Sequence, residues 1–72
     1  MLGSNERYIV RKSGKYLVGC PYDKESNVRY SDSKYDGYRM NDFNDARDVA
    51  KIVGGKVMKL NLLTGRIEGG WA

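Results

Sequence analysis

The chain of 72 residues contains no histidine, one cysteine and one proline. Without histidine it lacks the commonest general base and the usual nitrogen ligand of zinc. One cysteine can form neither an internal disulfide nor a cysteine-based metal site, and no histidine is present to activate Cys20 as a nucleophile. We therefore expect a non-enzymatic protein with no catalytic residues, no metal site and no cofactor.

Long hydrophobic stretches are also missing. No run of about 18 apolar residues is present, which predicts that the chain has no transmembrane helix. The N-terminal residues lack the apolar region of a signal peptide, and a lone cysteine without an export signal fits a reducing compartment. The sequence thus predicts a soluble cytoplasmic protein that does not bind a membrane.

The composition is that of one small folded domain. Hydrophobic residues make up 40% of the chain and charged residues 31%, as in ordinary soluble domains, and the length leaves no room for a second domain. We expect a disordered N-terminal segment at residues 1–6, a single α+β domain at residues 7–68 and a C-terminal tail at residues 69–72.

Residues that favour β-strands fill two neighbouring segments, residues 7–12 and 15–20, on either side of Ser13-Gly14. A two-residue linker that contains glycine is typical of a β-hairpin turn. The register that follows from this turn places Arg11 opposite Tyr16. Neither face of the hairpin is cleanly polar, so the sequence leaves open which face is core.

A polar connection, residues 21–37, follows the first hairpin and begins with the only proline. Its single strand-like part is Val28-Arg29-Tyr30, and Tyr38-Arg39-Met40 is the alternative third strand. A connection of this length in so small a domain is either functional or mobile.

The helical pattern is the clearest in the chain, because apolar residues repeat on one face (Phe43, Ala46, Val49, Ala50 and Val53). Asp42 is predicted to cap the N-terminus of this helix, with Asn41 as the alternative. Gly54-Gly55 is predicted to end it in a left-handed conformation. We interpret Asp45 and Asp48 as complementing the helix dipole rather than as metal ligands.

Alternation of apolar and polar residues resumes at residues 56–63. Thr64-Gly65 predicts a second two-residue turn, which would place Ile67 opposite Leu62. The predicted fold class is therefore α+β: a small antiparallel sheet of two hairpins plus a candidate extra strand, with one helix packed on one face.

Basic residues concentrate on the first hairpin of a chain whose formal net charge is +4. Cations beside aromatic rings suit single-stranded nucleic acid, through backbone contacts and base stacking, and a two-stranded ribbon also fits a major groove. The candidate nucleic-acid-binding residues are Arg7, Arg11, Lys12, Lys15 and Tyr16. The alternative is structural, because lysine and arginine on exposed strands prevent pairing between sheets.

Tyrosine and arginine gather in and beside the polar connection. These residue types are enriched at protein–protein hot spots. The candidate protein-binding residues are Tyr22, Arg29, Tyr30, Tyr35, Tyr38 and Arg39. Protein binding is the leading functional hypothesis at this point and nucleic-acid binding is the alternative; some of these rings could instead cover the small core. We expect a monomer or a weak homodimer.

The hairpin at residues 7–19 resembles the opening hairpin of short uncharacterised proteins of phages and prophages of Gram-positive bacteria. In that pattern a variable loop leads to Phe-x-x-Ala at a helix start, matched here by Phe43-Asn44-Asp45-Ala46, and a glycine-capped helix precedes a strand, matched by Gly54-Gly55-Lys56-Val57. The resemblance covers most of residues 7–63 and marks no functional residues. It implies a protein of the bacterial host cytoplasm that binds and modulates a host or defence protein.

The order hairpin, strand, helix is also similar to the arm-type DNA-binding domains of phage and transposon integrases. In those domains a three-stranded sheet enters the major groove. The low net charge and the long connection at residues 21–37 depart from that pattern.

Overall fold

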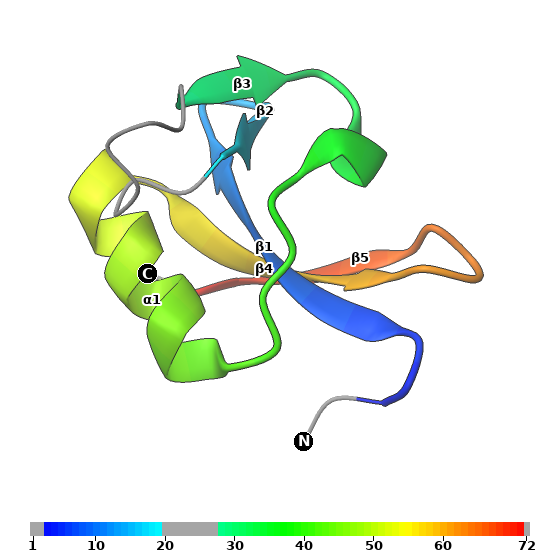
Figure 1. Ribbon diagram of the computed structural model, residues 1–72. Coiled ribbons are helices and arrows are strands. Elements are labelled where there is room, and N and C mark those ends of the chain that lie inside the picture. The colour runs from blue at the N-terminus through cyan, green and yellow to red at the C-terminus, as the bar shows by residue number, and fades with distance from the viewer. Residues whose placement is uncertain (1–2, 20–27, 72) are drawn as a thin grey trace.

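The computed structural model describes residues 3–19 and 28–71. It contains a five-stranded antiparallel sheet in the order β3-β2-β1-β4-β5 with one α-helix packed against it (Figure 1). The elements along the chain are β1 (Glu6–Lys12), β2 (Lys15–Val18), β3 (Arg29–Ser31), the short 3-10 helix η1 (Lys34–Asp36), α1 (Phe43–Val53), β4 (Lys56–Asn61) and β5 (Ile67–Trp71). The predicted α+β fold class is confirmed.

The first hairpin has the predicted turn and register. Ser13 and Gly14 both have positive φ, 52° and 80°, which is the backbone geometry of the two-residue turn that matches the twist of its strands. Arg11 lies opposite Tyr16, and Lys12 lies opposite Lys15.

Both candidates for the third strand take part in the sheet. Residues 29–31 form β3 on the outer edge of β2. The segment around Met40 instead bridges to Tyr8, with both backbone N–H···O distances at 2.8 Å, while the Tyr38 N–H donates to the carbonyl oxygen of Leu17. β2 pairs with β1 only near the turn, at Arg11 and Lys12. Further along β1, at Tyr8, the segment around Met40 lies beside it instead.

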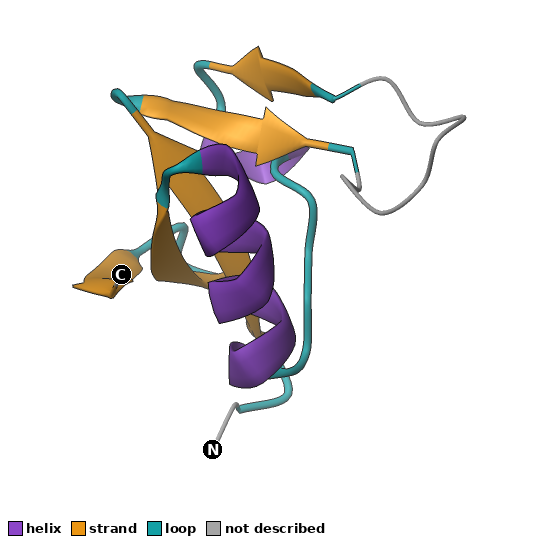
Figure 2. Cartoon of the chain, turned by 90° about the vertical axis from the view of Figure 1, so that its left-hand side faces the viewer, coloured by secondary structure: helices purple, strands orange, loops and turns teal. Residues whose placement is uncertain are grey.

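Helix α1 begins and ends where the sequence predicts. The Asp42 side chain caps its N-terminus by accepting a hydrogen bond from the Asn44 N–H at 2.7 Å. Gly54 ends it with φ 75°, and its N–H donates to the carbonyl of Ala50. Figure 2 shows α1 lying across one face of the sheet.

Apolar side chains pack on both faces of the sheet. The cluster under α1 contains Val10, Leu17, Met40, Ala46, Val49, Ala50 and Val57. The opposite face carries a second cluster of Ile9, Tyr16 and Leu60, flanked by Met58, Leu62 and Ile67. Gly37, just after η1, is buried against Ile9, so the chain around η1 covers this second face. The first hairpin has no polar face because both of its faces are core.

The closing hairpin differs from the prediction in its register. Ile67 lies opposite Leu60 rather than Leu62. The loop is longer than two residues because the Asn61 side chain accepts hydrogen bonds from the N–H groups of Leu63 and Thr64, at 2.9 and 3.0 Å. A shift of two residues keeps Ile67 on the expected face, since side chains alternate with a period of two.

The two ends of the predicted domain also differ from expectation. β1 begins at Glu6, inside the segment predicted to be disordered. β5 continues through Gly69 and Gly70 to Trp71, all of them in the predicted tail. The Trp71 ring packs edge-on against Phe43, with 5.7 Å between ring centroids, and this contact holds the end of β5 beside α1.

Candidate functional site

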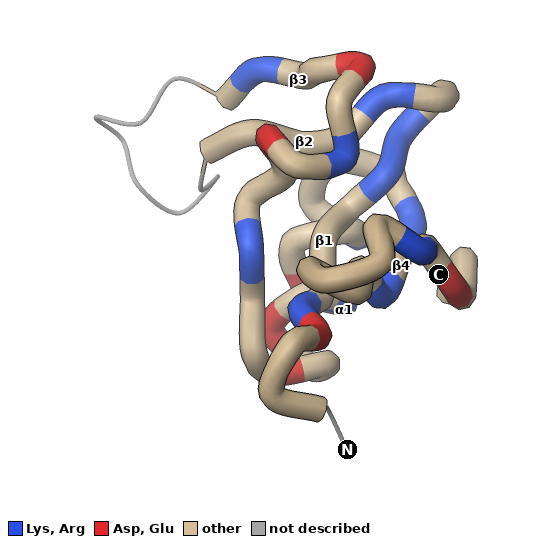
Figure 3. The backbone as a smooth tube through the Cα atoms, turned by 90° about the vertical axis from the view of Figure 1, so that its right-hand side faces the viewer, with Lys and Arg blue, Asp and Glu red and all other residues tan. Residues whose placement is uncertain are grey.

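Four cations and a tyrosine converge where the first hairpin meets the start of β4. We call this group the basic tip: Arg11, Lys12, Lys15, Tyr30 and Lys56. Figure 3 shows lysine and arginine segments following one another where β1 turns into β2. Long-range pairing builds the group, because β4 places Lys56 directly opposite Arg11 and β3 places Tyr30 on the far side of β2.

The cations of the basic tip face one another across the strands. Lys12 lies opposite Lys15, and Arg11 lies opposite Lys56. Like charges at directly opposite positions destabilise a sheet. The two pairs lie on opposite faces of the sheet, because Arg11 and Lys12 are successive residues of β1. Each pair is a cost to folding, and such costs concentrate at functional sites.

Two cavities adjoin at the basic tip. One of about 350 Å³ lies between the β1–β2 turn, the α1–β4 turn and the end of β5, and its charged lining residues are Arg11, Lys12 and Lys56. The other, of about 300 Å³, is lined by Lys12, Ser13, Lys15 and Tyr30. The cavities share Lys12 and Ser13, and none of the described carboxylates lines either one.

Little negative charge offsets the basic tip. Among the described residues, Arg11, Lys12 and Lys56 form no ion pair, and Lys15 approaches only the exposed Asp32, at 3.9 Å. Arg11 and Lys12 lie instead near the rings of Tyr16 and Tyr30, at 5.8 and 5.9 Å from the ring centroids. The positive field at the tip is thus available to an outside anion.

A second charged group, near the other end of β4, is neutral overall. We call it the balanced cluster: Glu6, Lys59, Arg66 and Glu68, which line a cavity of about 180 Å³. Lys59 Nζ lies 3.3 Å from Glu6 and 3.5 Å from Glu68, and Arg66 Nε lies 3.2 Å from Glu68.

Hydrogen bonds and neighbouring charges shift the pKa values of two members of the balanced cluster, Glu6 and Lys59. The hydrogen bond from the Gly3 N–H makes the largest contribution to lowering the pKa of Glu6, and the hydrogen bond from Lys59 makes the next largest. The hydrogen bond and charge of Glu6 raise the pKa of Lys59, and Glu68 adds to this effect. Each partner thus favours the charged form of the other.

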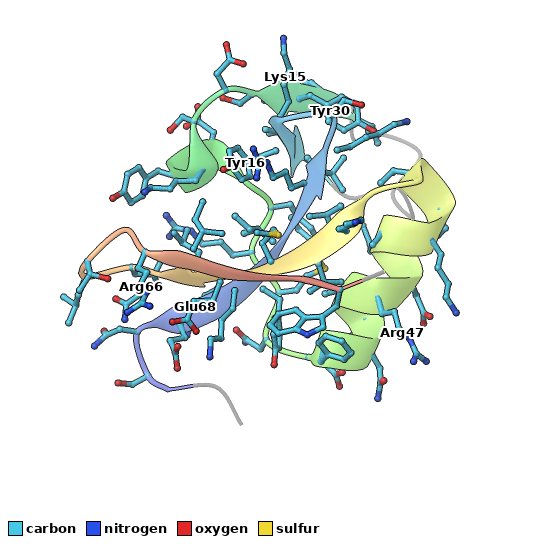
Figure 4. All side chains as sticks on the ribbon, turned by 180° about the vertical axis from the view of Figure 1, so that it is seen from behind. Lys15, Tyr16, Tyr30, Arg47, Arg66 and Glu68 are labelled. Carbon is cyan, nitrogen blue, oxygen red and sulfur yellow. The ribbon has the colours of Figure 1, made fainter. Side chains whose placement is uncertain are left out.

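The predicted nucleic-acid-binding residues separate in the structure. Arg11, Lys12 and Lys15 come together in the basic tip (Figure 4 labels Lys15 beside Tyr30). Arg7 lies near the opposite end of β1, where its guanidinium donates to the carbonyls of Glu6 and Ser4 at 2.6 and 3.2 Å. Tyr16 is only 8% exposed and packs with Ile9 and Leu60, so its ring belongs to the core and is not available for stacking.

The predicted protein-binding residues do not form one patch. Tyr22 lies outside the described residues. Arg29 and Tyr30 are exposed on β3, next to the basic tip. Tyr35 is 50% exposed on η1, and the Arg39 guanidinium donates to its carbonyl at 3.4 Å. Tyr38 packs against the cluster under α1.

Sequence reasoning missed Lys56 as a site residue and assigned Tyr30 to a different surface. Both reach the basic tip through strand pairing between distant parts of the chain. The local feature that could have pointed to Lys56 is Gly54-Gly55. These glycines end α1 and therefore place the start of β4 at Lys56.

No family model, curated protein or solved structure matches this chain. Within residues 3–19 and 28–71, no group of three or more acidic or cysteine side chains is placed to hold a metal ion. No helix of the described chain has the length and apolar character needed to cross a membrane.

Proposed function

We propose that this protein is a non-enzymatic module that binds single-stranded nucleic acid through the basic tip. The observation that supports this most is the pair of adjoining cavities, whose described lining residues include cations and an exposed tyrosine but no carboxylate. Three of the five candidate nucleic-acid-binding residues, Arg11, Lys12 and Lys15, lie together, whereas the candidate protein-binding residues do not form one patch.

The chemistry of the basic tip fits a single strand. Cations neutralise backbone phosphates and release condensed counterions, which supplies affinity without reading sequence. Tyr30 is 38% exposed, with Lys12 5.9 Å from its ring centroid. An exposed aromatic ring offers a stacking surface that only an unpaired base can use.

Fluorescence anisotropy with labelled single- and double-stranded oligonucleotides of one sequence tests the proposal. We expect the single strand to bind more tightly and the double variant Lys12→Gln/Lys15→Gln to lose at least about tenfold in affinity at 50 mM salt, because two phosphate contacts are removed. Arg47→Gln is the matched control: Arg47 is an exposed cation of α1, far from Lys15 and Tyr30 in Figure 4. Equal losses in both variants, or no binding, would contradict the proposal.

As a second candidate we propose a contact with a protein of the bacterial host or its defences. Tyr35 and Arg39 support it, since both are exposed and lie outside the basic tip. Crosslinking in host extract should capture a discrete partner with the wild type and with Arg47→Gln but not with Tyr35→Ala/Arg39→Ala. Capture that is unchanged in the double variant would rule out this surface.

A further inference from the structure

The larger cavity of the basic tip has a lining suited to a compact anion. Besides Arg11, Lys12 and Lys56, its wall is formed by Met58, Ser13 and glycines at positions 14, 54, 55, 69 and 70. A Cβ atom built on Gly14 or Gly54 would meet nothing within 4 Å, so the main chain here borders open space. A ligand can approach the backbone closely where side chains are absent.

Backbone donors add to the cations in this cavity. The N–H groups of Ser13 and Gly14 donate no hydrogen bond to any described residue outside the strand ladders. The amides of Gly54 and Gly55 are already used, because both donate to the carbonyl of Ala50 at the end of α1. Within the part of the chain that the structure describes, the donors left without an acceptor are thus those of the hairpin turn, beside Lys12.

The charge of the cavity selects among phosphate groups. An internal phosphodiester carries one negative charge, whereas a terminal phosphate monoester carries about −1.5 to −2 at pH 7 and three strong acceptor oxygens. Arg11 and Lys56 share one face and form no ion pair in the described chain, and Lys12 adjoins them with its ammonium group near Tyr30. Together with two turn amides that have no acceptor among the described residues, these cations exceed what a phosphodiester can use. They match a terminal phosphate, to which charge-assisted hydrogen bonds are strong.

We propose that this cavity binds the terminal phosphate of a nucleic-acid strand, with the neighbouring base at Tyr30 in the adjoining cavity. This inference rests on the proposed nucleic-acid function and adds a preference for phosphorylated ends. The volume of about 350 Å³ is sufficient for a group of nucleotide size, since ligand cavities begin at about 300 Å³.

The test compares oligonucleotides of one sequence that end in a 5′-phosphate, a 3′-phosphate or only hydroxyl groups. We expect one phosphorylated form to bind about tenfold more tightly than the hydroxyl form, the size of one charge-assisted hydrogen bond. Lys56→Gln should abolish this gain, so that the phosphorylated and hydroxyl forms bind this variant with equal affinity. Arg47→Gln should keep the gain.

The pH dependence of the gain provides a second readout. The second pKa of a phosphate monoester is about 6, and the chain has no histidine. Residues 3–19 and 28–71 contribute no carboxylate to the cavity lining, so a gain that shrinks between pH 7.5 and 5.5 reports the phosphate itself. A gain that is unchanged over this range would contradict binding of the dianion.

Inorganic phosphate separates a strand end from a free ion. We expect phosphate, at constant ionic strength against chloride, to shift the amide signals of Ser13 and Gly14 weakly, and the phosphorylated strand to shift them at far lower concentration. If all three oligonucleotides bind equally, the inference is overturned, while salt-dependent binding of the hydroxyl form would leave the proposed function standing. Saturation by inorganic phosphate without any gain for a phosphorylated strand would assign the cavity to the free ion and also overturn it.

Discussion

Lys56 and Lys59 lie on the same strand, β4, but their surroundings are opposite. Lys59 is held between two carboxylates in the balanced cluster, whereas Lys56 faces Arg11 and has no ion-pair partner in the described chain. The sheet therefore accommodates ion pairs readily at one end of this strand and leaves cations uncompensated at the other. This difference is the reason for proposing a binding function for the basic tip and a structural role for the balanced cluster.

Introducing a carboxylate into the basic tip should remove the difference between the surroundings of Lys56 and Lys59. We expect this change to have the largest effect on oligonucleotide affinity. Lys56→Glu creates an opposite-charge pair with Arg11, which removes two cations from the field that attracts phosphate. We expect affinity for a single-stranded oligonucleotide to fall by about 20-fold at low salt, measured by anisotropy. The melting temperature should rise at the same time, because a repulsive cross-strand pair becomes attractive.

A fall in both affinity and melting temperature would mean that Lys56 supports the fold instead. Lys56→Gln is the control for the loss of a single charge, and its affinity should lie between those of the wild type and Lys56→Glu.

Removing the stacking ring should have a smaller effect of a different kind. Tyr30→Ala should lower single-strand affinity by about fivefold, near the low end of the contribution of one stacked base. The salt dependence should not change, because no charge is removed. Tyr30→Phe keeps the ring and should bind like the wild type; a loss in this variant equal to that of Tyr30→Ala would rule out stacking.

Disturbing the balanced cluster should change stability with pH and leave binding unaffected. The pKa of Glu6 is lowered in the folded state, so its contribution to stability is present above its unfolded pKa of about 4.5 and is lost as the pH falls through the lowered value. Glu6→Gln should therefore lower the melting temperature at pH 7 and make it less dependent on pH between 6 and 3.

Circular dichroism melts across this pH range check the prediction, and oligonucleotide affinity at pH 7 is the control. If Glu6→Gln keeps the full acid dependence of the wild type, other carboxylates are responsible for it.

The sequence predicted those parts of the fold that depend on neighbouring residues. The bounds of α1 follow from Asp42, the apolar stripe and Gly54, which all lie in or next to the helix. The first hairpin follows from Ser13-Gly14. The second hairpin was predicted with the wrong register because the side chain of Asn61 selects a longer loop. The core role of Tyr16 and the place of residues 38–40 beside β1 depend on packing between distant segments.

The candidate site was predictable to a similar extent. Arg11, Lys12 and Lys15 are neighbours in the sequence and remain together in the structure. Lys56 and Tyr30 join them only through the pairing of β1 with β4 and of β2 with β3. No local pattern shows that Arg11, Lys12 and Lys56 have no carboxylate partner in the described chain, because that property depends on the complete arrangement of strands.

The most direct test of this account is the slope of log affinity against log salt concentration for a single-stranded oligonucleotide. If the four cations of the basic tip each neutralise one phosphate, the slope should be about −2.8, from about −0.7 per contact, and it should be reduced by about half in Lys12→Gln/Lys15→Gln. A slope near zero, or one that the double variant leaves unchanged, would contradict the assignment of the basic tip as a nucleic-acid interface.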